Sequence, residues 1–260
     1  LSIAGSDPSG GAGIQADLKT FSARGTYGMA VMTALTAQNT QGVTSVHNVP
    51  SAFVAEQIAA IFDDIAVGAI KIGMIASADI AGAVADSLRT QVQTPVVLDP
   101  VMVAKGGARL LPEDAIEAVR HELLPLAVLL TPNLPEAAAI LERPEAQSRD
   151  EMLAQANDLR ALGPTAVLLK GGHLGGGESP DLLVTAQGHT WIEGERVDTE
   201  NTHGTGCTLS SAIAAEIAKG ASIEEAVRTA KDYVTAAIAA SGALSVGSGH
   251  GPTHHFHAFW

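Results

Sequence analysis

Residues 127–136 read AVLLTPNLPE, a short apolar run that stops at a polar turn and continues into helix-forming residues. Three similar runs occur elsewhere: AIKI at 69–72, VVL at 96–98 and AVLL at 166–169. Apolar runs this short, without alternation, are typical of strands buried on both faces. The segments between them show helical spacing, as at Val54, Ile58 and Ile61. Strands that alternate with helices predict an α/β fold with a mostly parallel sheet.

The rest of the chain extends this pattern. The opening LSIAGSD, residues 1–7, predicts a strand and not a signal peptide. Residues 27–49 are rich in Thr and Val, which predicts antiparallel pairing or a flap at one sheet edge. Two long helices are expected at about 205–219 and 223–241. Because no linker or internal repeat is visible, residues 1–260 are expected to form a single domain.

Composition excludes several classes of function. The formal net charge of −13 argues against a nucleic-acid or anionic-membrane partner, which would need a basic face. One cysteine in the chain excludes an internal disulfide framework and Cys-rich zinc sites. No stretch has the roughly 18 uninterrupted apolar residues of a membrane span. These features predict a soluble, cytoplasmic α/β protein, in which a few local lysines and backbone N–H groups would have to hold any anionic substrate.

Polar residues follow the buried runs. Asp99 follows the run at 96–98, Asn133 comes shortly after the run at 127–130, and Lys170 follows the run at 166–169. Ligands of open parallel sheets bind beyond the carboxyl ends of the strands, so these residues form a candidate site. Asn133 and Glu136 also have the spacing of a helix cap, or alternatively of groups around the water shell of Mg²⁺, and the two roles are compatible. Lys170 at the end of a buried strand indicates an anionic partner.

Four other segments are rich in glycine or histidine. AGSDPSGGAG at 4–13 matches neither a Walker A loop nor G-x-G-x-x-G, and is either a loop around a ligand or a tight turn. THGTGCTLS at 202–210 leads into an amphipathic helix, whose unpaired N–H groups predict an anion site. GGHLGGGESPD at 171–181 is interpreted as a mobile cover or a loose hairpin. The histidines of GHGPTHHFHAFW at 249–260 are interpreted as tail packing rather than metal ligands.

Longer motifs carry a family resemblance. They are AGSDPSGGAGIQADLKTFSARGTYGM, TALTAQNTQGV, KIGM, LDPVM, TPNLPEAAAIL, KGGH, NTHGTGCTLSSAIAA and GPTHHFHAFW. In this order they resemble the hydroxymethylpyrimidine/phosphomethylpyrimidine kinases of thiamine biosynthesis, in the ribokinase-like superfamily, from residue 1 to residue 260. The resemblance implies a three-layer α/β/α sandwich, ATP and Mg²⁺ as cosubstrate and cofactor, and a homodimer. It also implies two ATP-dependent phosphorylations, of the hydroxymethyl oxygen of 4-amino-5-hydroxymethyl-2-methylpyrimidine and then of the resulting phosphate.

The resemblance assigns roles residue by residue. Gln38 would read the aminopyrimidine with both ends of its amide. The other residues implied in the pyrimidine pocket are Gly5, Asp17, Met74 and Val101. The residues implied around Mg²⁺–ATP are Asp99, Asn133 and Glu136, acting through water with no direct protein ligand to the metal. Lys170 would neutralise the phosphates. The residues implied in the anion hole are Gly204, Thr205, Gly206 and Cys207.

Cys207 occupies the position where sugar kinases of this superfamily carry an aspartate base. A free thiol has a pKa near 8.5, and a helix start is expected to lower it, which predicts a weak base for the first phosphorylation. The second step needs no base, because a phosphomonoester with a second pKa of about 6 is already anionic. Two alternatives stay open: a pyridoxal or pyridoxine kinase of the same superfamily, and a non-catalytic pyrimidine-binding protein.

Overall fold

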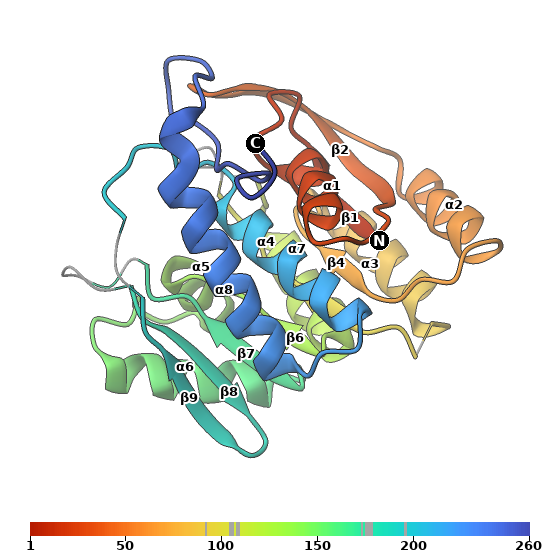
Figure 1. Cartoon of the computed structure of the whole chain (residues 1–260). Helices are drawn as coiled ribbons and strands as arrows, with labels where there is room; N and C mark the ends of the chain where they lie inside the picture. The colour runs from red at the N-terminus through yellow and green to blue at the C-terminus, as the bar shows by residue number, and fades with distance from the viewer. Residues whose placement is uncertain (92, 104–106, 108–109, 173, 175–178, 195–196) are drawn as a thin grey trace.

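The computed structural model describes residues 1–260 except 92, 104–106, 108–109, 173, 175–178 and 195–196 (Figure 1). The strands are β1 Ser2–Ser6, β2 Ala30–Asn39, β3 Gly42–Asn48, β4 Ile70–Ile72, β5 Val96–Leu98, β6 Leu129–Leu130, β7 Ala166–Leu169, β8 Asp181–Thr185 and β9 Gly188–Ile192. The helices are α1 Gly13–Ala23, α2 Ser51–Phe62, α3 Ala78–Arg89, α4 Glu113–Ala118, α5 Leu134–Leu141, α6 Arg149–Ala161, α7 Thr205–Ala218 and α8 Ile223–Ala239. Short π- and 3₁₀-helical turns cover Val119–Leu123, Leu124–Leu126 and Ala240–Ala243.

Within the described residues the strands form one sheet in the order β3-β2-β1-β4-β5-β6-β7-β8-β9. The six strands from β2 to β7 in this order are parallel, and β3, β8 and β9 pair antiparallel at the two edges. The prediction of a mostly parallel sheet is therefore confirmed. The antiparallel pairing expected in residues 27–49 is also found, between β2 and β3.

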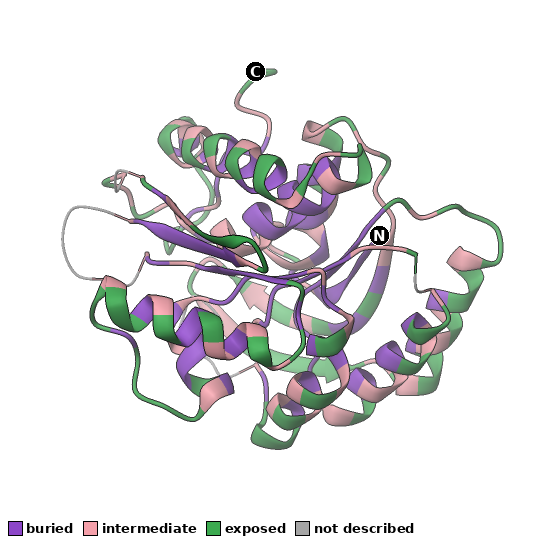
Figure 2. Cartoon of the chain, turned by 90° about the horizontal axis from the view of Figure 1, so that it is seen from below, coloured by how far each residue is buried: buried purple, intermediate pink, exposed green. Residues whose placement is uncertain are grey.

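Two layers of helices cover the sheet, which Figure 2 shows with helices on both sides of the buried strands. Helices α2 to α6 share one hydrophobic cluster with residues such as Val167 and Leu169 of β7. Helices α1, α7 and α8 share a second cluster with Ala166 and Leu168 of the same strand. Because successive side chains of a strand point to opposite faces, one uninterrupted apolar run supplies both cores. This is the three-layer α/β/α arrangement that the resemblance implied.

The structure differs from the sequence prediction at one strand, one helix and one hairpin. The run at 127–130 contributes only Leu129–Leu130 to the sheet, since a 3₁₀ turn ends at Leu126 shortly before it. Helix α8 ends at Ala239, two residues earlier than expected. The β8–β9 hairpin was not predicted: β9 lies at the sheet edge with exposed residues, whereas β8 lies inside the sheet and its short apolar run, residues 182–184, was overlooked. No helix in the part of the chain that the structure describes is long and apolar enough to cross a membrane.

Candidate active site

Asp99 and Lys170 meet at the carboxyl ends of β5 and β7, as the sequence predicted. Lys170 Nζ lies 2.9 Å from Asp99 Oδ1, and Asp99 is 1% exposed. Thr131 Oγ1 donates to the same carboxylate oxygen at 3.2 Å, and Ser210 Oγ of α7 lies 3.4 Å from the other. Burial disfavours the charged carboxylate, but the Lys170 and Lys71 ammonium groups outweigh it and hold the pKa of Asp99 below its usual value. The site therefore contains a buried, charged lysine–aspartate pair.

Asn133 and Glu136 begin helix α5 and form a complete capping box. Asn133 Oδ1 accepts from the Glu136 N–H at 2.8 Å, and Glu136 Oε2 accepts from the Asn133 N–H at 2.8 Å. Burial raises the pKa of Glu136 to about 7, against the attraction of Lys170, whose Nζ lies 3.9 Å away. The helix-cap interpretation is therefore confirmed. The magnesium role stays a prediction, and the oxygen-rich set of Asp99, Asn133 and Glu136 suits a hard cation that keeps its water.

The start of α7 is built on glycines and faces the Lys170–Asp99 pair. Gly204, the N-cap, has φ +78°, and a Cβ there would lie 1.8 Å from the carbonyl oxygen of Gly11. A Cβ at Gly206 would lie 3.4 Å from Lys170 Nζ and 3.7 Å from Asp99 Oδ2. The N–H groups of this helix start, with the positive end of its dipole, therefore open beside a cation. Such an arrangement is suited to an anionic group.

Thr205 differs from its neighbours in the expected anion hole. Its N–H donates to the Thr202 carbonyl at 3.3 Å, and its hydroxyl donates to the same carbonyl at 2.8 Å. Both groups therefore hold the turn before α7 in shape. The N–H groups that follow, those of Gly206 and Cys207, are the better candidates for direct contact with an anion.

Cys207 lies in the first turn of α7, but the expectation for its acidity was wrong. Burial raises the pKa of its thiol to about 11, helped by Asp17 and Asp99 and opposed by Lys71 and by the Gly13 N–H. Desolvation thus outweighs the favourable contributions of Lys71 and of the Gly13 N–H, and a sequence does not show the burial of a single residue. In the free protein Cys207 is therefore a neutral thiol at pH 7.

The residues assigned to the pyrimidine pocket lie at the ends of β1, β2, β4 and β5. A Cβ at Gly5 would lie 2.9 Å from Met74 Sδ, so these two residues are in close contact. Gln38 of β2 accepts from Thr36 Oγ1 at 3.2 Å, and its amide nitrogen lies 3.5 Å from His203 Nε2. Val101 follows β5 and is half-buried.

Asp17 is placed differently from the other pocket residues. Its side chain is 0% exposed, and both carboxylate oxygens bond to Lys71 Nζ, at 2.9 and 3.0 Å. Ser2 and Ser211 also donate to it. The carboxylate of Asp17 is therefore fully paired inside the protein.

Sequence reasoning missed two side-chain pairs next to the site, one lysine–aspartate ion pair and one histidine–aspartate contact. Besides Lys71 with Asp17, His203 Nε2 lies 2.8 Å from Asp7 Oδ2. Asp7 also accepts from the N–H groups of Ser9 and Ala12, which shapes the glycine-rich turn after β1. Asp7 and His203 stand inside glycine-rich motifs quoted above, but only the fold shows that the two motifs pack together.

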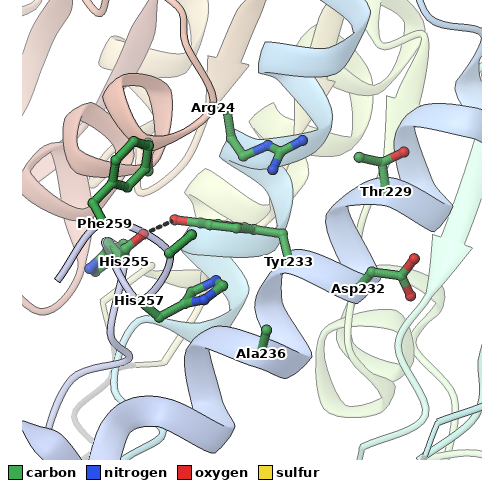
Figure 3. A pocket seen from close by; sticks show the side chains of 10 residues that line it. Arg24, Thr229, Asp232, Tyr233, Ala236, His255, His257 and Phe259 are labelled. Atoms are coloured by element: carbon green, nitrogen blue, oxygen red, sulfur yellow. Dashed lines mark hydrogen bonds between the residues drawn. The ribbon is translucent and has the colours of Figure 1, made fainter.

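The C-terminal segment packs against α7 and α8. Tyr233 Oη of α8 donates to the His255 carbonyl at 2.8 Å, beside a cavity of about 430 Å³ (Figure 3). His255 Nε2 lies 3.1 Å from Thr208 Oγ1, and burial, with the nearby Lys19, lowers its pKa to about 4. No cluster of His, Cys, Asp and Glu that could hold a metal occurs among the described residues. The packing of the C-terminal segment agrees with the tail interpretation.

The segment at 171–181 was interpreted as a mobile cover or a loose hairpin. Its residues 173 and 175–178 lie outside the described residues.

This sheet carries, at the carboxyl ends of its strands, a glycine-capped helix start that faces a buried lysine–aspartate pair, and the comparisons with known proteins assign this arrangement to the kinases. The chain belongs to the phosphomethylpyrimidine kinase family, whose model matches residues 7–254. It is 55% identical over 260 residues to the hydroxymethylpyrimidine/phosphomethylpyrimidine kinase of Salmonella typhimurium, covering 100% of this chain and 98% of the relative.

Two further comparisons place the chain among wider relatives. It is 49% identical over 255 residues to the thiamine biosynthesis bifunctional protein ThiED of Geobacter sulfurreducens, covering 98% of this chain and 51% of the relative. The solved ADP complex of Bacillus subtilis pyridoxal kinase superposes with a TM-score of 0.91 at 40% identity, covering 99% of this chain and 97% of that one.

Proposed function

We propose that this protein transfers the γ-phosphoryl group of ATP to the hydroxymethyl oxygen of 4-amino-5-hydroxymethyl-2-methylpyrimidine, and then phosphorylates the product to the diphosphate. The observation that carries the proposal is the Lys170–Asp99 pair at 2.9 Å beside the glycine start of α7, in a chain of the phosphomethylpyrimidine kinase family. The thiamine-biosynthesis name of a relative supports the pathway.

The proposed mechanism relies on positioning and charge. Phosphoryl transfer passes through a loose transition state, so neutralisation of the phosphate oxygens supplies most of the catalysis. The N–H groups of Gly206 and Cys207 would hold the transferred group, and the Lys170 ammonium would face its oxygens. Burial opposes the charge of Lys170, but Asp99 and Glu136 outweigh burial and raise the pKa of the ammonium to about 12. Mg²⁺ would be held through water near Asp99, Asn133 and Glu136, and would screen the triphosphate charge.

The acceptor end of the site is proposed from the pocket residues. Gln38 would pair with the aminopyrimidine, between the Met74–Gly5 contact and Val101. Cys207 would take the hydroxyl proton in the first step. Because its thiol is neutral at pH 7, that step should accelerate as the pH rises toward about 11. The second step, with an anionic acceptor, should lack this dependence.

Phosphorus NMR tests the proposal directly. The protein is incubated with Mg²⁺–ATP and hydroxymethylpyrimidine, and the monophosphate and diphosphate signals are followed over time, with Lys170→Met as a matched control. Sequential appearance of both signals is the expected result. Turnover of pyridoxal without turnover of the pyrimidine would establish the pyridoxal kinase alternative. Binding of the pyrimidine without any ATP consumption would establish the non-catalytic alternative.

The proposed enzyme is a cytoplasmic homodimer. We place it in the cytoplasm because its phosphoryl donor ATP is available there. Exposed apolar side chains on one sheet edge and its neighbouring helix support a dimer: Met32 and Leu35 of β2, Val46 of β3 and Phe53 of α2. Sedimentation velocity should give a mass of two chains, and a single-chain mass at micromolar concentration would refute this part.

A further inference from the structure

Lys231 of α8 and Asp181 of β8 form a largely buried ion pair that the mechanism above does not use. Lys231 Nζ lies 2.6 Å from Asp181 Oδ2, and the two side chains are 17% and 5% exposed. The same ammonium donates to the Ser179 carbonyl at 3.3 Å. A Cβ at Gly194 would lie 3.0 Å from Lys231 Cε, so the lysine packs directly over this glycine. The pair therefore ties helix α8 to the start of β8.

The other oxygen of the Asp181 carboxylate contacts the backbone next to Lys170. Asp181 Oδ1 accepts from the N–H of Gly171 at 3.0 Å. The N–H of Lys170 itself donates to the carbonyl of Pro132, after β6, at 2.8 Å. The N, Cα and C atoms of a residue set the direction of its Cβ. Because the peptides on both sides of Lys170 are held, the direction in which its side chain leaves the strand is held too.

Lys170 and Asp181 also lie on the same face of the sheet. Leu168 comes two residues before Lys170, and Leu183 comes two residues after Asp181. Both leucines belong to the core that α7 and α8 share. Side chains two residues apart on a strand point to the same face, so Lys170 and Asp181 both face these helices.

On this face each lysine has its own acid. Lys170 Nζ lies 2.9 Å from Asp99 Oδ1, whereas Asp181 pairs with Lys231. Lys231 thus balances the charge of Asp181, and Lys170 stays directed to Asp99 beside the start of α7.

We propose that Asp181 and Lys231 are positioning residues for phosphoryl transfer: the Asp181 carboxylate holds the peptide that follows Lys170, and Lys231 balances the charge of that carboxylate. Both act through Lys170, whose ammonium faces the phosphate oxygens in the proposed mechanism. The kinetic part of this inference rests on the proposed function, and the hold on the Gly171 N–H does not.

Two double variants that differ in one hydrogen-bond acceptor test the proposal. Asp181→Asn/Lys231→Met and Asp181→Leu/Lys231→Met both replace the ion pair by neutral side chains of similar size. Removing both charges together avoids leaving one buried charge unpaired. The asparagine still offers an oxygen to the N–H of Gly171, whereas the leucine does not.

Amide hydrogen exchange at residue resolution measures the hold on Gly171 without substrate. Exchange at the Gly171 amide should stay within about threefold of the wild type in the asparagine variant and become about tenfold faster in the leucine variant. The Lys170 amide, bonded to the Pro132 carbonyl, is the internal reference. Equal exchange at Gly171 in the two variants would overturn the proposal.

The kinetic measurement separates positioning from a structural role. Both phosphorylations use Lys170, so in the active kinase the leucine variant should have about tenfold lower kcat than the asparagine variant in each step, with an unchanged KM for the pyrimidine. A purely structural pair would change Tm and leave kcat of the folded enzyme equal in the two variants, which would refute the positioning role. Glu224→Gln/Arg228→Met removes an exposed ion pair of 2.9 Å on the same helix and should change neither exchange nor kcat.

A third variant keeps the test decisive where the leucine variant does not fold. Asp181→Ala/Lys231→Met also lacks the acceptor and needs no additional space. Exchange at Gly171 and kcat equal to those of the asparagine variant would again refute the proposal. A wild-type protein that does not phosphorylate pyrimidine would refute the proposed function, while exchange at Gly171 would still decide whether Asp181 holds this peptide.

Discussion

Replacing Gly204 with alanine should disable phosphoryl transfer while the protein stays folded. Gly204 caps α7 with φ +78°, and a Cβ at this position would lie 1.8 Å from the carbonyl oxygen of Gly11. Ordinary contact of a Cβ begins near 3.4 Å. The two glycine-rich segments would therefore have to move apart by more than about 1 Å, and a misplacement of this size at a reacting centre costs about 100-fold in rate.

The left-handed backbone contributes a second, smaller effect. An L-residue in this conformation costs about 1–2 kcal/mol, which corresponds to a fall in Tm of roughly 2–8 °C for a chain of this length. Gly25 gives a matched control, since it has φ +73° and no atom lies within 4 Å of the position that a Cβ would take. Gly25→Ala should lose a similar amount of stability and keep its activity.

The assay measures kcat/KM for the first phosphorylation together with Tm for both variants. The expected result is about a 100-fold loss for Gly204→Ala and less than about a threefold loss for Gly25→Ala. Retention of activity within about threefold by Gly204→Ala would show that the contact with Gly11 does not position the anion hole. Similar losses in both variants would trace the effect to stability alone.

Three further predictions concern the acceptor, the pyrimidine pocket and the helix cap. Cys207→Ala should slow the first phosphorylation by about 100-fold and the second far less, because only the hydroxyl needs a base; equal losses in single-turnover rates would remove the base assignment. Gln38→Ala should raise KM for both pyrimidines by about tenfold through lost hydrogen bonds, and an unchanged KM would place the pocket elsewhere. The folded-state pKa of Glu136 is raised to about 7 from 4.5, so its contribution to stability is complete below about pH 4.5 and is lost as the pH rises through 7. Glu136→Gln keeps the cap geometry but carries no titrating carboxyl group. Between about pH 5 and pH 8, the Tm of this variant should fall less than the Tm of the wild type. Parallel curves of Tm against pH for the two proteins would contradict the raised pKa of Glu136.

The sequence predicted the elements whose signal is local. The run at 166–169 is a strand, and Asn133 with Glu136 caps α5 through side chains three residues apart. Lys170 and Asp99 could be assigned to one site because the carboxyl ends of parallel strands share one edge of a sheet. Strand β9 gives a weak local signal because it is an exposed edge strand, whereas β8 carries a buried apolar run that the sequence prediction overlooked.

Burial and partners across the sheet required the tertiary structure. Asp17 was assigned to the pyrimidine pocket by resemblance, and its pairing with Lys71 joins residues 54 positions apart. Burial also raises the pKa of the Cys207 thiol, contrary to the expectation, because desolvation depends on the atoms that the fold packs around the sulfur.

The amino-acid sequence by itself determined the α/β fold, the family and the identity of the residues at the strand ends. These depend on patterns within a few residues and on motifs that keep their order along the chain. Only the tertiary structure decided the charge state of those residues and which neighbours balance them. The physical reason is that pairing and desolvation depend on distances across the sheet, which no local spacing specifies.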